Sequence, residues 1–355
     1  MTTRQDIINS FDPNGPGLPG KIFGLPFNQE NAELIIIPVP WEVTVSYHAG
    51  TAEGPEAVLN ASIQVDLFLK DLPGAWKMGI YMLPVQEDLL AENYKYRDLA
   101  RKYIDWLEQN EEEWISNELK VIPREIDEVC EKLNIYVRSQ ALKFIKQGKM
   151  VGLLGGDHST PLGLIKAVAE TYGSVGILQI DAHADLRRSY EDFKYSHASI
   201  MYNAMHVKGI SNLVQVGIRD FCEEEMQFIE SSGGIIKTFF DSDLKSALYE
   251  GESWSSLCQK IVSQLPEKVY LSIDIDGLDP KLCPNTGTPV PGGLEFDEMV
   301  YLIKTIVKAQ KVIVGFDINE VAPGDDEWDA NVGARLLYIV GSLMGASQGK
   351  IRFNV

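Results

Sequence analysis

Short apolar runs alternate with longer amphipathic stretches along most of this chain. The apolar runs have strand length and lie at 33–40, 151–156, 175–180, 213–218, 234–240, 269–275 and 311–318. The stretches that follow the later runs have helical spacing and lie at 160–171, 195–208, 223–232, 253–265, 295–309 and 329–347. This alternation predicts βαβ units, and therefore an α/β fold with a parallel sheet and right-handed crossovers.

The first part of the chain has a different pattern. Residues 1–32 are rich in Gly, Pro and Asn and predict an irregular amino-terminal arm. A Gly-rich loop and a helix start occupy residues 41–62, with Pro55 suited to the first helical turn. Residues 86–147 read as almost unbroken helix, which we interpret as a helical insertion. Because no repeat, low-complexity tract or linker interrupts the pattern, we expect one domain over residues 1–355.

Three segments that directly follow predicted strands carry most of the reactive side chains: GGDHS (155–159), DAHAD (181–185) and SIDIDGLDP (272–280). They supply two imidazoles and four carboxylates, which are His158, Asp181, His183, Asp185, Asp274 and Asp276. Within DAHAD and DID these groups recur at every second residue, so in extended backbone they would share one face. The carboxyl ends of parallel strands meet at one sheet edge. We therefore expect the six groups to converge on a site for two divalent cations.

The net charge, the cysteines and the lack of long apolar segments indicate which partners and which cellular compartment to expect. The 355 residues carry a formal net charge of −19, which argues against nucleic acid and anionic membranes as partners and fits a cationic substrate. Four cysteines without a CxxC pair predict free thiols in a reducing compartment. The amino terminus lacks the apolar core of a signal peptide and no segment approaches the length of a membrane span, so we expect a cytoplasmic protein.

The three segments resemble, in order, the metal-binding signatures of the ureohydrolase family, which includes arginases, agmatinases and related guanidino-compound hydrolases. SYHAGTAEGPEAV (46–58) and GFDINEVAP (315–323) resemble its first and last signatures. The resemblance covers residues 33–350 and is closest to the agmatinase-like branch. It implies a three-layer α/β/α sandwich with a mainly parallel eight-stranded sheet, and a homo-oligomer, either a trimer or a hexamer.

The resemblance also assigns the ligands. The first metal would be bound by His158, Asp181, Asp185 and Asp274, and the second by Asp181, His183, Asp274 and Asp276. Asp181 and Asp274 would bridge the two ions. An oxygen-rich set with one imidazole per metal and no thiolate suits Mn²⁺ better than zinc, while Ni²⁺ and Co²⁺ stay open. Two adjacent cations can hold a bridging hydroxide at neutral pH that attacks the guanidinium carbon, releasing urea and an amine.

Three residues are assigned catalytic roles by the same resemblance. Asp185 would be one of the ligands of the first metal ion, beside which the reaction would take place. His197, in YSHAS, would pass a proton to the departing amine, a task that a pKa near neutrality fits. Glu320, at the end of a predicted strand, would accept hydrogen bonds from the guanidinium NH groups.

Departures from the family pattern bear on the substrate. Arginases bind an α-amino acid head through polar residues that Arg187, Arg188, Phe221 and Cys222 do not reproduce, so agmatine is favoured over arginine. His48 stands where agmatinases have an arginine. Guanidinobutyrate, guanidine and formimidoylglutamate stay open as substrates. The alternatives outside this chemistry are a non-catalytic metal-binding homologue and a single-zinc amidohydrolase of related fold.

Overall fold

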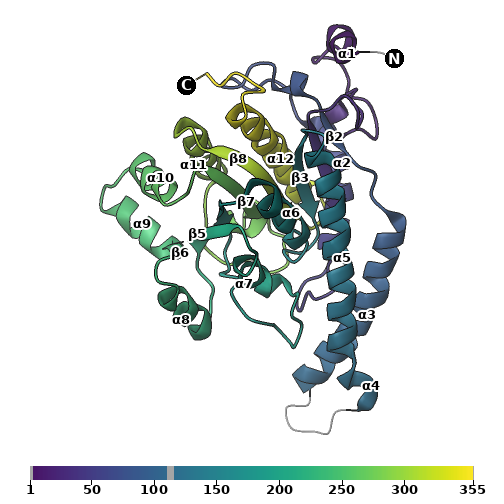
Figure 1. The fold of residues 1–355 in the computed structure, drawn as a ribbon, viewed down its shortest axis with the longest axis vertical. Coiled ribbons are helices and arrows are strands. Elements are labelled where there is room, and N and C mark those ends of the chain that lie inside the picture. Colours follow the sequence, from purple (N-terminus) through teal and green to yellow (C-terminus); the bar gives the residue numbers. More distant parts are fainter. Residues whose placement is uncertain (1–2, 110–115, 355) are drawn as a thin grey trace.

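The computed structural model describes residues 3–109 and 116–354. Within these residues an eight-stranded sheet forms the centre of the molecule (Figure 1). All neighbouring strands are parallel, in the order β2-β1-β3-β8-β7-β4-β5-β6. The strands are β1 (Leu34–Val39), β2 (Ile80–Met82), β3 (Met150–Gly155), β4 (Val175–Ile180), β5 (Ile210–Ile218), β6 (Ile236–Phe240), β7 (Lys268–Asp274) and β8 (Val312–Asn319).

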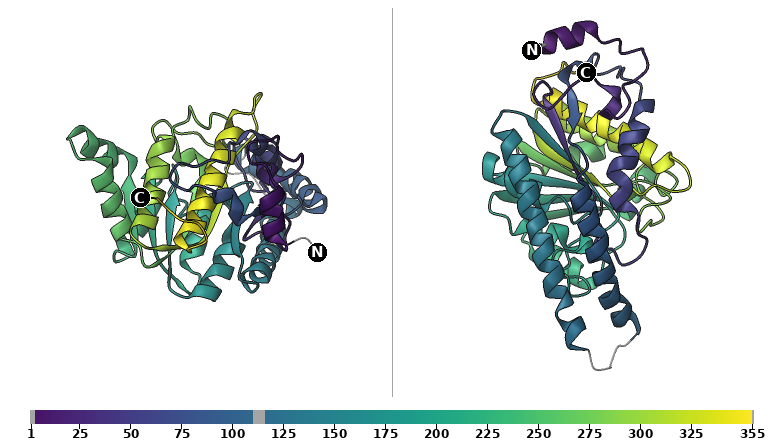
Figure 2. Two further views of the ribbon diagram at one scale, coloured as in Figure 1. Left: turned by 90° about the horizontal axis from the view of Figure 1, so that it is seen from above. Right: turned by 90° about the vertical axis from the view of Figure 1, so that its right-hand side faces the viewer.

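Helices cover both faces of this sheet, so the fold is a three-layer α/β/α sandwich (Figure 2). Helices α5, α6 and α7 contact the strands on one face, and α2, α11 and α12 contact them on the other. The helices are α1 (Arg4–Ser10), α2 (Gly54–Ala61), α3 (Glu87–Gln109), α4 (Asn117–Lys120), α5 (Ile122–Ile145), α6 (Leu162–Tyr172), α7 (Ile200–Met205), α8 (Glu223–Ser231), α9 (Asp241–Tyr249), α10 (Trp254–Ser263), α11 (Phe296–Lys308) and α12 (Trp328–Ser347).

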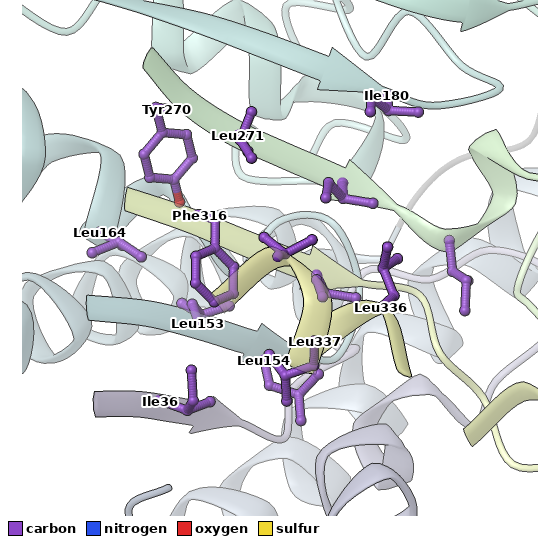
Figure 3. Packing of buried hydrophobic residues seen from close by; sticks show 14 of the residues in the cluster. Ile36, Leu153, Leu154, Leu164, Ile180, Tyr270, Leu271, Phe316, Leu336 and Leu337 are labelled. Carbon is purple, nitrogen blue, oxygen red and sulfur yellow. The ribbon is translucent and has the colours of Figure 1, made fainter. Parts of the chain in front are cut away.

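The central strands are mostly apolar on both faces because helices cover both sides of the sheet. All six residues of β3 and all six of β4 are buried. Figure 3 shows the resulting core, with Tyr270 and Phe316 on the neighbouring strands β7 and β8 among aliphatic side chains. Gly152 of β3 leaves room for the Phe316 ring, since a Cβ there would lie 2.3 Å from its Cζ atom. Such close packing leaves little freedom in the strand positions.

The predicted strands are all present, and the structure adds details that periodicity missed. The edge strand β2 is too short to show a period, and helix α9 was not predicted. The predicted helix at 195–208 is shorter than expected, with a 3₁₀ turn at His197–Ser199 followed by α7. The predicted arm at 1–32 contains the short helix α1.

The predicted helical stretch at 86–147 consists of the long helices α3 and α5 and the short helix α4, with residues 110–115 lying outside the described part. Helix α5 starts with Pro123 in its first turn, where a missing N–H costs no hydrogen bond. The two long helices run side by side and extend beyond the sheet (Figures 1 and 2). Helix α5 packs along α6, and α3 packs on α5.

Two further observations concern the sequence-based expectations. Among the described residues, no helix is long and apolar enough to cross a membrane. The cysteines Cys130, Cys222, Cys258 and Cys283 are free, and all but Cys222 are buried, as expected for thiols outside a disulfide framework.

Candidate metal centre

Four adjacent strands in the middle of the sheet present the predicted site residues at their carboxyl ends. In sheet order β3, β8, β7 and β4 lead into His158, Glu320, Asp274 and Asp181 respectively. The parallel register places Asp274 directly beside Asn319, one residue before Glu320. Convergence of three distant segments therefore follows from strand order, as the sequence pattern suggested.

The first group of potential ligands surrounds the Nδ1 atom of His158. Asp181 Oδ2 lies 2.9 Å from it, Asp185 Oδ2 lies 3.1 Å from it and Asp274 Oδ2 lies 3.5 Å from it. All four side chains are buried. His158, Asp181 and Asp185 together have the spacing of a metal-binding group.

The second group surrounds the Nδ1 atom of His183. Asp276 Oδ2 lies 3.0 Å from it, and Asp181 Oδ1 lies 3.6 Å from it. Asp181, His183 and Asp276 again have metal-binding spacing. Because Asp181 offers one oxygen to each group, it has the position of a bridge between two ions.

Asp274 has a less symmetrical position than the resemblance implied. Its Oδ2 belongs with the first group, while its Oδ1 accepts a hydrogen bond of 2.8 Å from the backbone N–H of Asp276. Its role as a second bridge stays a prediction. Burial, followed by the charges of Asp276 and Asp181, raises the pKa of Asp274 well above the ordinary value.

The donor set fits two divalent cations. His158 Nδ1 and Asp276 Oδ2 are buried, yet neither has a hydrogen-bond partner in the described part of the chain. Each of these atoms nevertheless lies within 3.0 Å of a side-chain atom of its own group, and a cation is a natural partner for nitrogen and oxygen lone pairs that are held this close together. The crowding of carboxylates points the same way: burial and the nearby charge of Asp181 raise the pKa of Asp185 to about 7. Imidazole nitrogens and carboxylate oxygens are common ligands of divalent metal ions in proteins.

The local backbone differs from the extended conformation that we expected for the DAHAD segment. Strand β4 ends at Ile180, and Asp185 has a φ of 54°. Asp185 therefore reaches the site through a turn in the left-handed region and not through the alternation of a strand. Glu320 likewise follows the end of β8 with a φ of 63°. Non-glycine residues in this region are strained, and such strain is concentrated at functional sites.

Glycines in the motifs allow the segments to approach one another. A Cβ at Gly156 of GGDHS would lie 2.0 Å from the carbonyl oxygen of Trp41. A Cβ at Gly277 of SIDIDGLDP would lie 2.7 Å from the backbone nitrogen of Asp181. Only glycine fits where backbone packs against backbone this closely.

A buried chain of hydrogen bonds orients His158. Its Nε2 lies 3.0 Å from Ser272 Oγ, and the Ser272 hydroxyl donates to Asp317 Oδ1 at 2.9 Å. This arrangement leaves Nδ1 facing the carboxylates, as outer groups do for metal-bound histidines. The sequence analysis missed Ser272 and Asp317, although a polar residue at 317 within an apolar strand is a signal that could have found it.

A second network fixes Asp181 and the loop after it. Gln179 donates to Asp181 Oδ2 at 2.8 Å and to the carbonyl of His183 at 3.2 Å. Gln215 of β5 donates to Gln179 Oε1 at 2.6 Å and to the carbonyl of Ala184 at 2.8 Å. Both glutamines are completely buried, and both were also missed.

A cavity of about 170 Å³ opens onto the centre. Its inner lining includes His158, His183, Asp185, His197, Asp274 and Glu320. Side chains nearer the outside include Ser46, Arg187, Tyr190, Asp220, Phe221 and Thr288. The cavity thus joins the predicted ligands to both additional residues assigned catalytic roles, and its size suits a small molecule.

Glu320 is 6% exposed, and its Oε1 accepts a hydrogen bond of 2.8 Å from the backbone N–H of His158. Burial and the charge of Asp157 raise its pKa well above the ordinary value, so a bound cation would stabilise its ionised form. Asp157 itself accepts hydrogen bonds from the backbone and hydroxyl of Ser159 and thereby shapes the turn that carries His158.

His197 is partly buried, and its ring meets Tyr190 edge-on with centroids 5.9 Å apart. Burial and the positive charge at His183 lower the pKa of His197 to about 3, below the near-neutral value expected from the sequence. The imidazole is therefore neutral, and a pKa this low makes it a weaker proton acceptor than the near-neutral group expected from the sequence. His48 is exposed beside Tyr47 and does not line the cavity.

The model of the arginase family matches residues 32–341. The chain belongs to the arginase family. It is therefore grouped with hydrolases that act on the C–N bonds of linear amidines.

Individual relatives extend over nearly the whole chain. An N(1)-aminopropylagmatine ureohydrolase from Thermus thermophilus is 30% identical over 321 residues, which are 90% of this chain and 93% of the relative. An agmatinase from Halalkalibacterium halodurans is 27% identical over 92% of this chain and 96% of its own length. The crystal structure of agmatine ureohydrolase of Thermoplasma volcanium has a TM-score of 0.70 and 22% identity, covering 98% of this chain and 99% of that one. This structural likeness confirms the predicted arginase-like fold.

Proposed function

We propose that this protein hydrolyses a small cationic guanidino compound, agmatine or a close derivative, to urea and an amine. The observation that carries the proposal is a cavity, in a member of the arginase family, that brings the buried carboxylate of Glu320 together with two groups of imidazole and carboxylate donors. We also propose that two Mn²⁺ ions occupy these groups, with His158 and Asp185 on one, His183 and Asp276 on the other, and Asp181 between them.

When bound, two adjacent divalent ions lower the pKa of a water molecule and supply a nucleophile at neutral pH. The protein itself supplies orientation and proton transfer. A guanidinium is always cationic and presents pairs of N–H donors, so the Glu320 carboxylate can hold it by charge-assisted hydrogen bonds. The imidazole of His197 lines the same cavity, where it could pass a proton to the departing amine once a bound substrate and bound ions had changed its surroundings.

The outer part of the cavity favours an amine-bearing substrate. The Asp220 side chain is 67% exposed, with its Oδ2 3.9 Å from His183 Nε2. An ammonium group at the far end of the substrate could pair with this carboxylate. The names of the relatives support this choice, since agmatine and its aminopropyl derivative are both guanidino amines.

A guanidino acid such as 4-guanidinobutyrate is the second candidate, and Arg187 is the observation that favours it. The Arg187 guanidinium also lines the cavity and could bind a distal carboxylate. However, its Nε lies 4.0 Å from Glu225 Oε2 and its charge lies over the Tyr190 ring, so part of its attraction for an anion is already offset. We therefore place the guanidino amines first.

The test is a substrate panel. Protein loaded with Mn²⁺, and separately with Ni²⁺, would be assayed for urea release from agmatine, N(1)-aminopropylagmatine, 4-guanidinobutyrate, guanidine and arginine, and for formamide release from formimidoylglutamate. We expect the highest kcat/KM with one of the first two compounds. A higher kcat/KM for 4-guanidinobutyrate would favour the second candidate.

Release of product from no compound under either metal would contradict the proposal. In that case a non-catalytic metal-binding role would be the better interpretation. Metal content, measured on the same samples, separates a protein that failed to load from one that loads and does not turn over.

A further inference from the structure

Helix α3 contacts two of the segments that line the outer part of the cavity, each of which forms one wall. One wall is the segment 42–52, which contributes Ser46, and the other is the loop 187–198, which contributes Arg187, Tyr190 and His197. The two loops are far apart in sequence. We propose that α3 is a brace that fixes these walls relative to each other, with Asn93 and Tyr103 as its positioning residues.

At one end of the contact, α3 holds the first wall through Asn93. Asn93 is completely buried, and its Oδ1 accepts a hydrogen bond of 2.7 Å from the backbone N–H of Glu42. The Glu42 carboxylate in turn accepts hydrogen bonds from the backbone of Gly50 at 2.6 Å and of Ala52 at 3.2 Å. The segment is therefore folded around Glu42, and Glu42 is tied to the helix.

At the other end, α3 holds the second wall through Tyr103. Its hydroxyl donates a hydrogen bond of 2.6 Å to Asp192 Oδ2, and its ring meets Phe193 edge-on at 5.8 Å. Tyr190 and Phe193 exchange backbone hydrogen bonds around a tight turn, with Glu191 and Asp192 at positive φ between them.

That turn determines where the reactive side chains of the second wall lie. Tyr190 meets the ring of His197 edge-on, and the backbone N–H of Arg187 donates to the carbonyl of Ala198 at 3.1 Å, which closes the loop. A turn with two non-glycine residues at positive φ is held only when surrounding contacts enforce it. Tyr103 supplies two such contacts, to Asp192 and Phe193. It therefore helps to fix the position of Tyr190, which in turn contacts the ring of His197.

Arg97 lies one turn after Asn93 on the same face of α3, and Tyr103 lies about 80° around the helix from Asn93. Residues 93, 97, 100 and 104 have the spacing of a single helical stripe. The Arg97 guanidinium is attracted by Glu42 of the first wall, by Asp157 and, less strongly, by Glu191 of the second wall, and its buried Nη1 has no hydrogen-bond partner in the described part of the chain. Helix α3 thus contacts the first wall through the hydrogen bond of Asn93 and the second wall through the hydrogen bond of Tyr103.

The experiment is a double-mutant cycle on Asn93→Ala and Tyr103→Phe. The two residues are ten positions apart, about 15 Å along the helix, a separation at which effects are normally additive. If α3 is a brace, releasing either end frees both walls. We expect each single variant to lower kcat/KM by about threefold to tenfold, and the double variant to lose little more than the worse single one. Multiplicative losses would overturn the inference.

Two matched variants separate positioning from a general loss of stability. Tyr96→Phe removes a hydroxyl from the same helix that meets Lys95 at the surface, and should leave kcat/KM unchanged. Asp192→Asn keeps an acceptor for Tyr103 and a side chain that tolerates positive φ, so it should stay near wild type. A loss in Tyr96→Phe equal to that in Tyr103→Phe would overturn the assignment.

The kcat/KM measurements rest on the proposed function. A second measurement, which does not depend on enzyme activity, is therefore needed. Amide hydrogen exchange in Tyr103→Phe should rise in residues 187–198 and also in residues 42–52, the wall that Tyr103 does not touch. Increased exchange in residues 187–198 alone would contradict the brace. This test uses only the Tyr103→Phe variant, so it holds even if Asn93→Ala fails to fold. Absence of urea release by the wild-type protein would instead refute the proposed function, and the exchange result would still decide the role of α3.

Discussion

At the residue scale, one carboxylate position decides how the two potential ion sites are linked. Asp181 offers one oxygen to each group, whereas Asp274 Oδ2 lies with the first group and Oδ1 accepts the Asp276 N–H. The resemblance predicts that Asp274 serves both ions.

The variant Asp274→Asn tests that assignment. Removing one charge between two cations leaves both underneutralised, so bound Mn²⁺ should fall well below two ions per chain. Elemental analysis after dialysis measures this, with Asp279→Asn, a turn residue outside the cavity, as the control. Loss of only one ion would show that Asp274 is not a bridge, and full occupancy would remove it from the ligand set.

His197→Ala tests the proton-transfer role. Because His197 lies outside both ligand groups, metal content should stay intact while kcat falls by about 10²–10⁴, the range for general acid–base groups. His206→Ala, which changes an exposed histidine at the end of α7, is the control. Metal loss in the His197 variant would make it a ligand, and normal turnover would leave it with a structural role.

Glu320→Gln tests the guanidinium anchor. The amide keeps the shape but accepts through one oxygen and has no charge, so the guanidinium would be held less firmly. Small misplacement of a reacting group is costly, and kcat/KM for the best substrate should fall by more than about tenfold with metal content unchanged. A kcat/KM within about twofold of wild type would show that Glu320 is not the anchor.

At the element scale, the turn between Tyr190 and Phe193 contains a carboxyl group that costs stability when ionised. Glu191 is partly exposed, but its Oε2 is buried without a hydrogen-bond partner in the described part of the chain. Burial and the charge of Glu108 raise its pKa from 4.5 to about 7, with Arg97 acting in the opposite direction. Between these values the folded protein holds a proton that the unfolded chain has lost.

The free energy of unfolding should therefore fall as the pH rises from about 4.5 to about 7, and Glu191→Gln should lack this contribution. The variant should gain stability relative to wild type across that window. Denaturant unfolding at several pH values measures the difference, with the exposed Glu230→Gln as control. A constant difference between Glu191→Gln and wild type would contradict the shift.

At the scale of the whole molecule, the ends of four strands bring several buried carboxylates close together. Two bound cations would offset the repulsion between these carboxylates. An ion that binds only the folded state stabilises it by mass action. We expect added Mn²⁺ to raise Tm by several degrees and a chelator to reverse the change, measured by calorimetry on one preparation. An unchanged Tm at saturating Mn²⁺ would contradict tight binding.

The homotrimer or homohexamer implied by the family resemblance stays a prediction that sedimentation equilibrium would test.

The sequence by itself determined the order of strands along the chain, the helices between most of them and the identity of the clustered donors. Those features are local: apolar runs of strand length, helical spacing and motifs such as GGDHS are visible in a few consecutive residues. Misses also have local causes, since Ile80–Met82 is too short to show a period.

Only the tertiary structure decided how these pieces meet. Strand order brings β3, β8, β7 and β4 together, while the left-handed turn at Asp185 replaces the extended conformation that alternation suggested. Ser272, Asp317 and Gln215 gained their roles from partners on other strands. The same holds for α3, whose sequence predicts a helix but not the two loops it contacts. Such relations depend on groups that lie 36 to 162 residues apart in the sequence. A local pattern cannot encode them, so they form only when the sheet is assembled.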